Sequence, residues 1–323
     1  MLFLACGHKS NEVEVENTGY AQGTTFQIKY LAESGTDYSS EIKGLFLQID
    51  NSMNTYIPNS LISKINQGDV WVQVDTLFLS VLNRSVEVAK ETDGEFDPTV
   101  GPLVELWGFG LSKKHLVTQA QVDSVKQLIG YPKIEREGRK IRIPKGSKLD
   151  FNAIAQGFTV DVIAEFLEEK GTKNYMVEVG GEVRARGKNK AGNTWKIGID
   201  KPTETIDQTD RFQIIIALQD ASLATSGNYR KFWVDENTGI KYAHTIDPKT
   251  GFPAKNKLLS ASVITANTMD ADVYATACMV KGLDECYSYL SGKENVDAYL
   301  VYTDEDGNWK TRYTEGFNKY IAN

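Results

Sequence analysis

Helical periodicity is frequent in the first half of the chain. Apolar side chains recur every three or four positions from Ser39 to about Asn54 and from Thr76 to Thr92, which predicts two amphipathic helices. Ser60 and Thr118 each stand before a shorter run of the same kind, where a hydroxyl can cap the free backbone N–H groups of a helix. A further helix is predicted to follow Gly157. This half of the chain is therefore expected to be rich in helix.

The second half contains more short runs in which apolar and polar side chains alternate, as in half-buried strands. The last two runs form a hairpin through Glu305–Asn308. The predicted strands are Thr24–Leu31, Lys140–Ile143, Lys148–Phe151, Asn174–Val179, Gly181–Gly187, Trp195–Asp200, Phe212–Leu218, Leu223–Ser226, Leu259–Thr265, Ala298–Tyr302 and Trp309–Tyr313. The sequence has no long linker, so its 323 residues form one large domain or two ordinary ones.

Composition is typical of soluble globular proteins and narrows the range of partners. Hydrophobic residues make up 41% of the chain and charged residues 24%, and the net charge is -7 from 36 basic and 43 acidic side chains. Because no basic run stands out, nucleic acid is not expected as a partner. A ligand that carries phosphate would need a local cation, which a metal ion could supply.

The three cysteines suggest two different roles. Cys278 and Cys286 lie in helical or near-helical context and are expected to be buried thiols rather than a disulfide. Cys6 follows an apolar run that resembles the tail of a bacterial lipoprotein signal, and a polar tether from His8 to Asn17 comes next. An ordinary apolar N-terminus is the alternative, and the run is far too short to span a membrane. We expect a lipid anchor at Cys6, on the periplasmic side of the inner membrane.

The stretch Asn267–Gly282 combines a strong helix pattern with candidate metal ligands. Its first two residues can cap the helix, acids occupy the first turn where the helix dipole favours them, and a glycine ends it. Asp272 and Thr276 are four positions apart and share one face. A carboxylate beside a hydroxyl suits Mg²⁺ or Ca²⁺ rather than zinc. The alternative is an acid near a helix start and a threonine that bonds to its own backbone.

Three loops contain further candidates. Asp150–Gly157 turns through small residues into a helix start, whose free N–H groups are suited to binding an anion. Glu95–Pro102 is a rigid loop, and the aromatic residues in and after it either pack as core or line a pocket for a flat ligand. In Tyr242–Gly251 a lone histidine, His244, stands beside a strong turn signal and has either a structural or a catalytic role.

Taken in order, these segments resemble one family, the FAD:protein FMN transferases, often called the ApbE family. The resemblance covers nearly the whole chain from about Gly19, and so many motifs in one order are very specific. The matching segments are Gly19–Phe26, Met53–Ser60, Gly94–Leu103, Trp107–Gly110, Asp150–Gly157, Val179–Glu182, Ala224–Gly227, His244–Gly251, Met269–Asp272 and Ala275–Thr276.

The resemblance implies a single α+β domain over residues 19–323, after a remnant and tether at 1–18, with mixed or antiparallel sheets, packed helices and FAD in a central cleft. It places Mg²⁺ on Asp272, Thr276 and the backbone carbonyl of Ala153, and makes Asp272 and His244 the candidate catalytic residues. The residues that it assigns to FAD are Gln22, Tyr56, Glu95, Phe96, Asp97, Asp150, Gln156, Ser226, Gly227, His244 and Ile246. The family often has lysine at position 156 and methionine at position 22. A neutral amide at position 156 donates hydrogen bonds but cannot balance phosphate charge.

The implied reaction is a Mg²⁺-dependent phosphoryl transfer. The hydroxyl of a threonine or serine on an acceptor flavoprotein, expected to be a membrane-associated redox protein, attacks the phosphorus on the riboflavin side of FAD. AMP leaves, and FMN stays on the acceptor as a phosphoester. Two alternatives remain open: hydrolysis of FAD to FMN and AMP by the same residues, and FAD binding without turnover in a lipoprotein.

Overall fold

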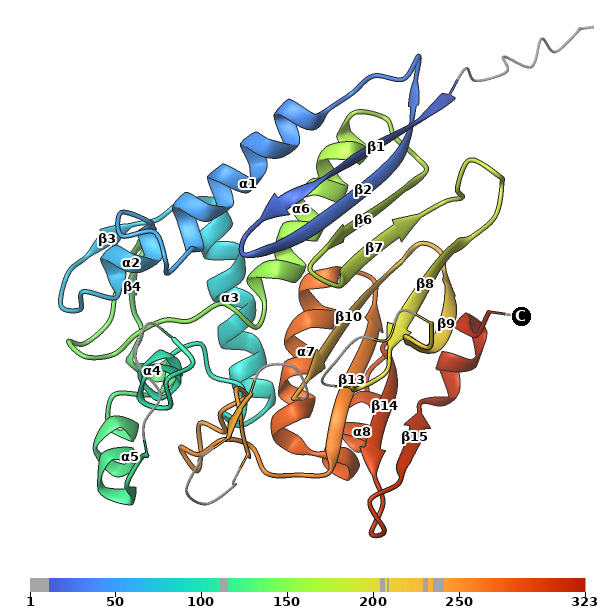
Figure 1. The fold of residues 1–323 in the computed structure, drawn as a ribbon. Helices are drawn as coiled ribbons and strands as arrows, with labels where there is room; N and C mark the ends of the chain where they lie inside the picture. Colours follow the sequence, from blue (N-terminus) through green and yellow to red (C-terminus); the bar gives the residue numbers. More distant parts are fainter. Residues whose placement is uncertain are drawn as a thin grey trace, which may run out of the picture.

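An eight-stranded antiparallel sheet forms the centre of the computed structural model (Figure 1). The structure describes residues 12–110, 116–203, 207, 209–228, 232–234 and 241–322. The strands lie in the order β1-β2-β6-β7-β10-β13-β14-β15. Their bounds are β1 (Glu12–Ala21), β2 (Thr24–Glu33), β6 (Tyr175–Val179), β7 (Glu182–Arg186), β10 (Ala221–Gly227), β13 (Leu258–Thr265), β14 (Asp297–Thr303) and β15 (Trp309–Tyr313).

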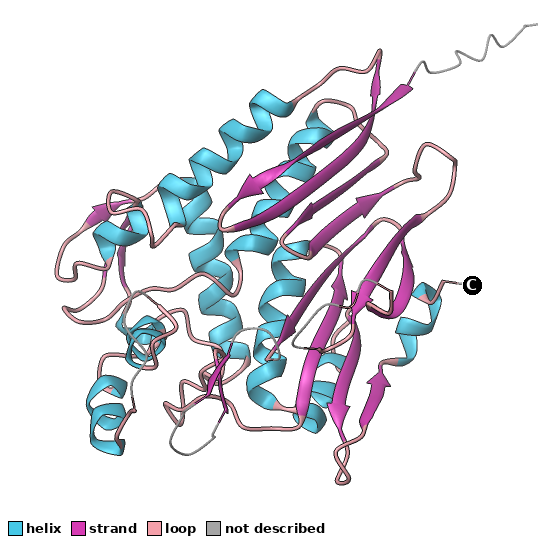
Figure 2. Ribbon diagram, viewed as in Figure 1, coloured by secondary structure: helices cyan, strands magenta, loops and turns pink. Residues whose placement is uncertain are grey.

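Helices cover one face of this sheet, and the hairpin of β8 (Trp195–Asp200) and β9 (Phe212–Leu218) covers part of the other (Figures 1 and 2). Side chains along β14 alternate between the two layers, because successive residues of a strand point to opposite faces. Leu300 packs with helix residues, whereas Val301 packs with the β8-β9 hairpin. The predicted α+β class with antiparallel sheets and packed helices is confirmed.

The helices carry most of the residues that position the candidate site. They are α1 (Ser39–Met53), α2 (Leu61–Ile65), α3 (Thr76–Glu91), α4 (Gly101–Leu106), α5 (Gln119–Lys126), α6 (Ala155–Glu169), α7 (Thr268–Lys281) and α8 (Leu283–Ser291), with 3-10 turns η1 (Tyr131–Lys133) and η2 (Glu315–Tyr320). Small sheets outside the central one contain β3 (Val72–Gln73), β4 (Glu135–Glu137) and β5 (Lys140–Arg142), and, separately, β11 (Phe232–Val234) and β12 (Lys241–Ala243).

The predicted helix starts are confirmed by their capping hydrogen bonds. The Ser60 hydroxyl accepts the Ser63 N–H at the start of α2, and Thr118 forms a capping box at the start of α5. The Asn267 side chain accepts the Asp270 N–H in the first turn of α7 at 2.8 Å. These local signals were sufficient because each cap lies within three residues of the groups it satisfies.

Two secondary-structure predictions are wrong. Residues 12–18, expected within the tether, belong to β1, which pairs with β2 over its whole length, so the predicted domain boundary falls inside a strand. Lys148–Phe151 is not a strand and retains one isolated bridge. There the Leu149 N–H and carbonyl bond to the side chain of Asn66, at 2.7 and 2.9 Å, while the Asp150 N–H donates to Pro98. Proline has no N–H with which to continue a ladder.

The expectation of two free thiols is also wrong. Cys278 of α7 and Cys286 of α8 form a disulfide, and both residues are fully buried. The disulfide fastens α8 to the helix that carries the candidate metal ligands. Cys6 lies outside the described residues. Among the helices that the structure describes, none is both long and apolar enough to cross a membrane.

Candidate functional site

The candidate site is centred on one face of α7. Asp272 is 5% exposed, and Thr276, one turn later, is half-buried. The Thr276 hydroxyl lies 3.0 Å from the hydroxyl of Ser226 near the end of β10. The structure therefore brings together three predicted residues that come from segments 50 positions apart.

The start of α6 packs directly against this face. The Gly157 N–H donates to the Asp272 carboxylate at 2.9 Å, and a Cβ added at Gly157 would lie 2.8 Å from the Asp272 Cβ. Ala153 lies in the turn just before α6 and is half-buried. The Gln156 amide donates to the Val179 carbonyl at 2.9 Å. This amide is thus used to hold the turn between β6 and β7 against α6.

The electrostatic environment of Asp272 suits a cation. Burial raises the pKa of this carboxyl to about 7; the Gly157 N–H partly opposes the rise and the nearby Asp161 adds to it. In the described part of the chain no lysine or arginine forms an ion pair with Asp272. A buried acid without a cationic partner, beside a hydroxyl, fits the oxygen ligands that Mg²⁺ takes. No three His, Cys, Asp or Glu side chains converge within the described residues, so a metal bound here would also need hydroxyl or backbone carbonyl ligands.

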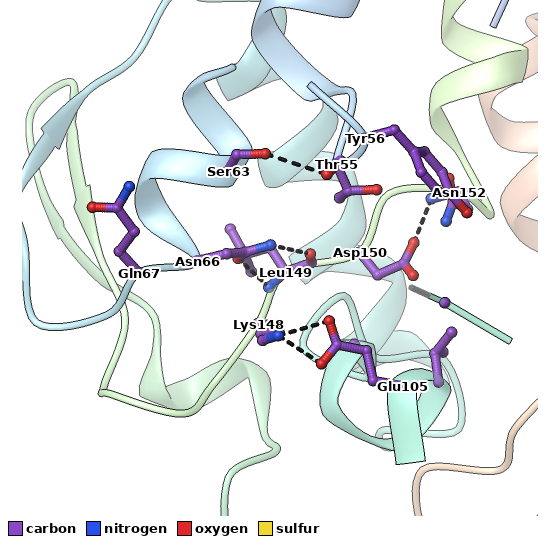
Figure 3. Close-up of a pocket in the computed structure, with 13 residues that line it drawn as sticks. Thr55, Tyr56, Ser63, Asn66, Gln67, Glu105, Lys148, Leu149, Asp150 and Asn152 are labelled. Carbon is purple, nitrogen blue, oxygen red and sulfur yellow. Dashed lines mark hydrogen bonds and ion pairs between the residues drawn. The ribbon is translucent and has the colours of Figure 1, made fainter. Parts of the chain in front are cut away.

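A cavity of about 210 Å³ opens beside the segment that leads into α6 (Figure 3). Two of the predicted FAD residues line it: Tyr56, which is 60% exposed, and Asp150. Burial raises the pKa of Asp150, although the Asn152 N–H donates to its carboxylate at 2.8 Å. The cavity is also lined by the ion pair of Lys148 with Glu105 at 2.6 Å. Because Asp150 and Gly157 lie in one short segment, this segment links the cavity to Asp272.

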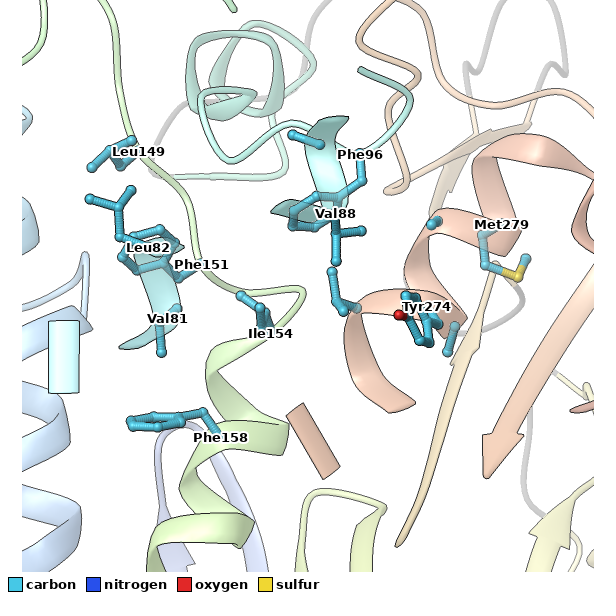
Figure 4. Close-up of a cluster of buried hydrophobic side chains, with 14 of the residues drawn as sticks. Val81, Leu82, Val88, Phe96, Leu149, Phe151, Ile154, Phe158, Tyr274 and Met279 are labelled. Carbon is cyan, nitrogen blue, oxygen red and sulfur yellow. The ribbon is translucent and has the colours of Figure 1, made fainter. Parts of the chain in front are cut away.

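The loop that follows α3 does not offer its side chains to this cavity. Phe96 is 6% exposed and packs in the main hydrophobic cluster with Val88 (Figure 4). Asp97 is buried and accepts the N–H groups of Thr99 and Tyr131, at 2.8 and 2.9 Å. Glu95 forms an ion pair with Lys281 of α7. The Phe96 and Asp97 side chains are thus used to build the loop, and the prediction that residues 95–97 help line the FAD site stays a prediction.

His244 and Ile246 lie beside a separate aromatic cluster. We use this name for Trp107, Trp233, Tyr242 and Phe252, whose ring centroids lie 4.6 to 5.4 Å apart in contacting pairs. Ile246 is buried beside it. The ring centroids of His244 and Phe109 lie 6.4 Å apart in a T-shaped arrangement. The loop approaches β10 next to His244, because the Thr245 hydroxyl donates to Asn228 at 2.8 Å. Asn228 is two residues beyond Ser226, so His244 lies on the side of the site formed by the end of β10.

The remaining predicted residues occupy turns. Gln22 has a φ of 51° and forms, with Gly23, the two-residue turn between β1 and β2. This turn lies next to the β6-β7 turn, since the Gly180 N–H donates to the Thr25 carbonyl at 3.0 Å. Gly227 ends β10. Gln22 is thus close to Gln156 through the β6-β7 turn, whereas no contact of the described chain brings Glu95 to that turn.

Sequence reasoning missed two residues that shape the site. Asp161 of α6 binds the start of α7, and Asn66 holds the backbone just before Asp150. Asp161 follows Gly157 by one helical turn, which places it on the same face, but its partners lie 107 and 108 positions away. No local pattern identifies such a partner.

Known proteins share this arrangement over nearly the whole chain. The model of the ApbE family matches residues 22–300. The chain is 34% identical to the FAD:protein FMN transferase of Haemophilus influenzae, over 98% of this chain and 94% of that protein. It is 35% identical to the FAD:protein FMN transferase of Vibrio cholerae, over 99% and 97%.

Solved structures agree with these relatives. The flavin transferase ApbE from Vibrio cholerae superimposes with a TM-score of 0.85 at 33% identity, covering 96% of this chain and all (100%) of that one. The apo form of the Pseudomonas stutzeri flavinyl transferase ApbE gives a TM-score of 0.85 at 27% identity, covering 96% and 97%.

Proposed function

The chain belongs to the ApbE family, and we propose that it is an FAD:protein FMN transferase whose chemistry takes place around Asp272. The observation that carries the proposal is the buried Asp272 carboxylate, which accepts the Gly157 N–H at the start of α6 and shares a helix face with Thr276. A helix start, a buried acid and clustered hydroxyls suit a phosphate group bound together with a cation. The pyrophosphate of FAD is such a group.

Mg²⁺ is the proposed cation, held by the side chains of Asp272 and Thr276 and by the carbonyl of Ala153. When bound, it would neutralise charge that develops on the phosphate oxygens in the transition state. The chain supplies the fixed geometry: Gly157 orients the Asp272 carboxylate, and Ser226 orients the Thr276 hydroxyl at 3.0 Å. Tyr56 and Asp150 line the cavity next to this site, where part of FAD is proposed to lie.

The proposed reaction joins FMN to an acceptor protein. The hydroxyl of an acceptor threonine or serine forms a new bond to the phosphorus on the riboflavin side, the bond from that phosphorus to the bridging oxygen breaks, and AMP leaves. The hydroxyl proton must go to a base, and His244 is the proposed residue that guides it. The acceptor is proposed to be a membrane-associated flavoprotein.

A location in the bacterial cell envelope, on the periplasmic side, is proposed with this activity. The buried disulfide between Cys278 and Cys286 supports it, because disulfides persist in oxidising compartments such as the periplasm. The sequence around Cys6 adds the proposal of a lipid anchor. A mass measurement of the N-terminal peptide from envelope fractions tests the anchor, since an unmodified Cys6 would contradict it.

Mass spectrometry of acceptor proteins tests the activity. The chain is incubated with FAD, Mg²⁺ and candidate acceptor proteins, and each acceptor is then weighed. We expect one acceptor to gain the mass of one FMN less one water per modified hydroxyl, with one AMP released. Release of FMN and AMP without a labelled acceptor would favour FAD hydrolysis instead.

A further inference from the structure

The structure assigns a positioning role to Asp161, a buried acid of α6 outside the segments that identify the family. We infer that Asp161 fixes the start of α7 and thereby sets the position of Asp272 relative to α6. The inference rests on the proposed function, because it concerns the same metal site.

Asp161 caps α7 from the neighbouring helix. One carboxylate oxygen accepts the N–H of Thr268 and the other accepts the N–H of Met269, each at 2.8 Å. These are the first two residues of α7, and the N–H groups of a first turn have no partner within their own helix. The local cap, Asn267, accepts the N–H of Asp270 and leaves these two donors free. Both N–H groups thus have an acceptor on α6, so this contact fixes the start of α7.

Each of the two helices supplies a carboxylate that accepts backbone N–H groups at the start of the other helix. Asp161 of α6 accepts N–H groups at the start of α7, and Asp272 of α7 accepts the Gly157 N–H at the start of α6. Between these contacts the backbones touch, since a Cβ on Gly157 would lie 2.4 Å from the Thr268 carbonyl oxygen. A shift of α7 along α6 would break at least one carboxylate contact. The position of Asp272 is therefore set from both ends of its first helical turn.

The two carboxylates differ in their hydrogen-bond and charged partners. The Arg184 guanidinium lies 3.0 Å from Asp161, so this acid has a cationic partner in addition to two N–H donors. Asp272 has one N–H donor and, within the described chain, no paired lysine or arginine. Asp161 thus has the bonds of a structural acid, and Asp272 retains unshared oxygen lone pairs for a metal. A metal ligand must keep free lone pairs, whereas the residue that orients it must be fully bonded, and these two acids differ in that way.

Substitution Asp161→Asn tests the inference, because it keeps the size of the side chain but turns one acceptor into a donor that faces an N–H group. Mn²⁺ replaces Mg²⁺ as the probe, and its binding is measured by electron paramagnetic resonance with saturating FAD and no acceptor. Loss of a residue that orients a metal ligand costs roughly 10–100-fold in metal affinity, and we expect a loss in this range. FAD affinity without metal, read from flavin fluorescence, should match that of wild type, since Asp161 is not among the residues that line the cavity.

Asp75→Asn is the matched control. Asp75 caps α3 by accepting the Phe78 N–H at 2.7 Å and bonds to Ser52 of α1, so the same chemical change is made at the start of a helix other than α7. This variant should lose thermal stability but bind Mn²⁺ as wild type does. Should Asp161→Asn fail to fold, Asp161→Glu, which keeps the charge and the Arg184 partner but lengthens the side chain, is measured in its place, and a smaller loss is expected.

Two results would overturn the inference. One is a folded variant at position 161 that binds Mn²⁺ as tightly as wild type, and the other is an equal loss in the Asp75→Asn control. Failure of the proposed metal site looks different: wild-type protein would then bind no Mn²⁺ even with FAD present.

Discussion

The α6-α7 pair and the aromatic cluster hold two parts of the proposed active site by different means. In the helix pair, aspartate carboxylates bond to backbone N–H groups, and a glycine lets the backbones of α6 and α7 touch. In the aromatic cluster, ring packing is supplemented by two indole bonds: Trp107 donates to the Gly251 carbonyl at 2.8 Å, and Trp233 donates to the Trp107 carbonyl at 3.2 Å. A metal ligand and a residue that guides a proton both need close placement, so each arrangement must hold its residue firmly.

The comparison predicts that damage to the helix pair and damage to the aromatic cluster have different effects on metal binding. Damage to the helix pair should reduce metal binding and turnover together, because Asp272 belongs to both. Damage to the aromatic cluster should reduce turnover through the His244 loop while metal binding stays intact.

Asp272→Ala should have the largest effect. It removes the only carboxylate of the proposed metal site, so turnover should fall at least ~1,000-fold, equivalent to about 4 kcal/mol of activation free energy. Excess Mg²⁺ should restore little, and FAD should still bind. The measurement is AMP release in the presence of acceptor. Asp270→Ala is the control on the same helix: Asp270 pairs with Arg84 at 2.6 Å, so that variant should lose stability but keep most turnover. Near-normal activity in Asp272→Ala would place the metal elsewhere.

Gly157→Ala should destabilise the helix pair. Its new Cβ would lie 2.4 Å from the Thr268 carbonyl oxygen, a backbone atom that cannot move aside alone. Overpacking of this kind costs about 1–3 kcal/mol in the free energy of unfolding. Gly44→Ala is the matched control, because Gly44 lies within α1 and an added Cβ meets nothing within 4 Å. That change should stabilise the protein by about 0.5–1 kcal/mol, as Gly to Ala does in an open helix. Thermal unfolding shows whether each variant is more or less stable than wild type. Two shifts in the same direction would contradict this account of the α6-α7 contact.

Trp107→Phe should weaken the aromatic cluster and leave the metal site intact. The substitution keeps a ring but removes the donor to the Gly251 carbonyl, and a buried carbonyl without a partner costs about 1–3 kcal/mol. We expect lower stability, turnover reduced by about tenfold through the displaced His244 loop, and unchanged Mn²⁺ affinity. Urea unfolding, AMP release and Mn²⁺ binding are compared on the same preparation. Loss of Mn²⁺ affinity would show that the two parts are not independent.

Gln156→Lys should have the smallest effect. The Gln156 amide bonds to the Val179 carbonyl and carries no charge toward the start of α6. A lysine there adds a cation, so FAD should bind about two- to fivefold more tightly at low Mg²⁺, as expected for an exposed charge pair, with less difference once Mg²⁺ saturates. Gln156→Met, similar in length without a donor, should show no gain. Identical FAD titrations for the lysine variant and wild type at every Mg²⁺ concentration would remove position 156 from the site.

The sequence predicted what local patterns can specify. The start and end of α7, the shared face of Asp272 and Thr276, and the cap of α5 all depend on residues within one or two turns, and the structure agrees with them. The resemblance to a family added segments that no periodicity could connect, and the matches to known transferases confirm that family and the α+β fold.

The errors have a common physical cause, because each depends on a tertiary contact that the local pattern does not specify. The acidic start of β1 looks like a solvated tether until β2 pairs with it. The Cys278–Cys286 disulfide depends on how α7 meets α8, and the role of Asp161 depends on residues more than 100 positions away.

Acceptor dependence of AMP release tests the central claim most directly. The chain, FAD and Mg²⁺ are mixed with no acceptor, with a competent acceptor, and with the same acceptor carrying alanine in place of its modified threonine. A transferase keeps water from the phosphorus until the partner's hydroxyl arrives. We therefore expect slow AMP release without acceptor, fast release with the competent acceptor at one flavin per site, and neither labelling nor acceleration with the alanine variant. Fast release of AMP and FMN under all three conditions, with no labelled protein, would contradict the transferase account and identify the chain as an FAD pyrophosphatase.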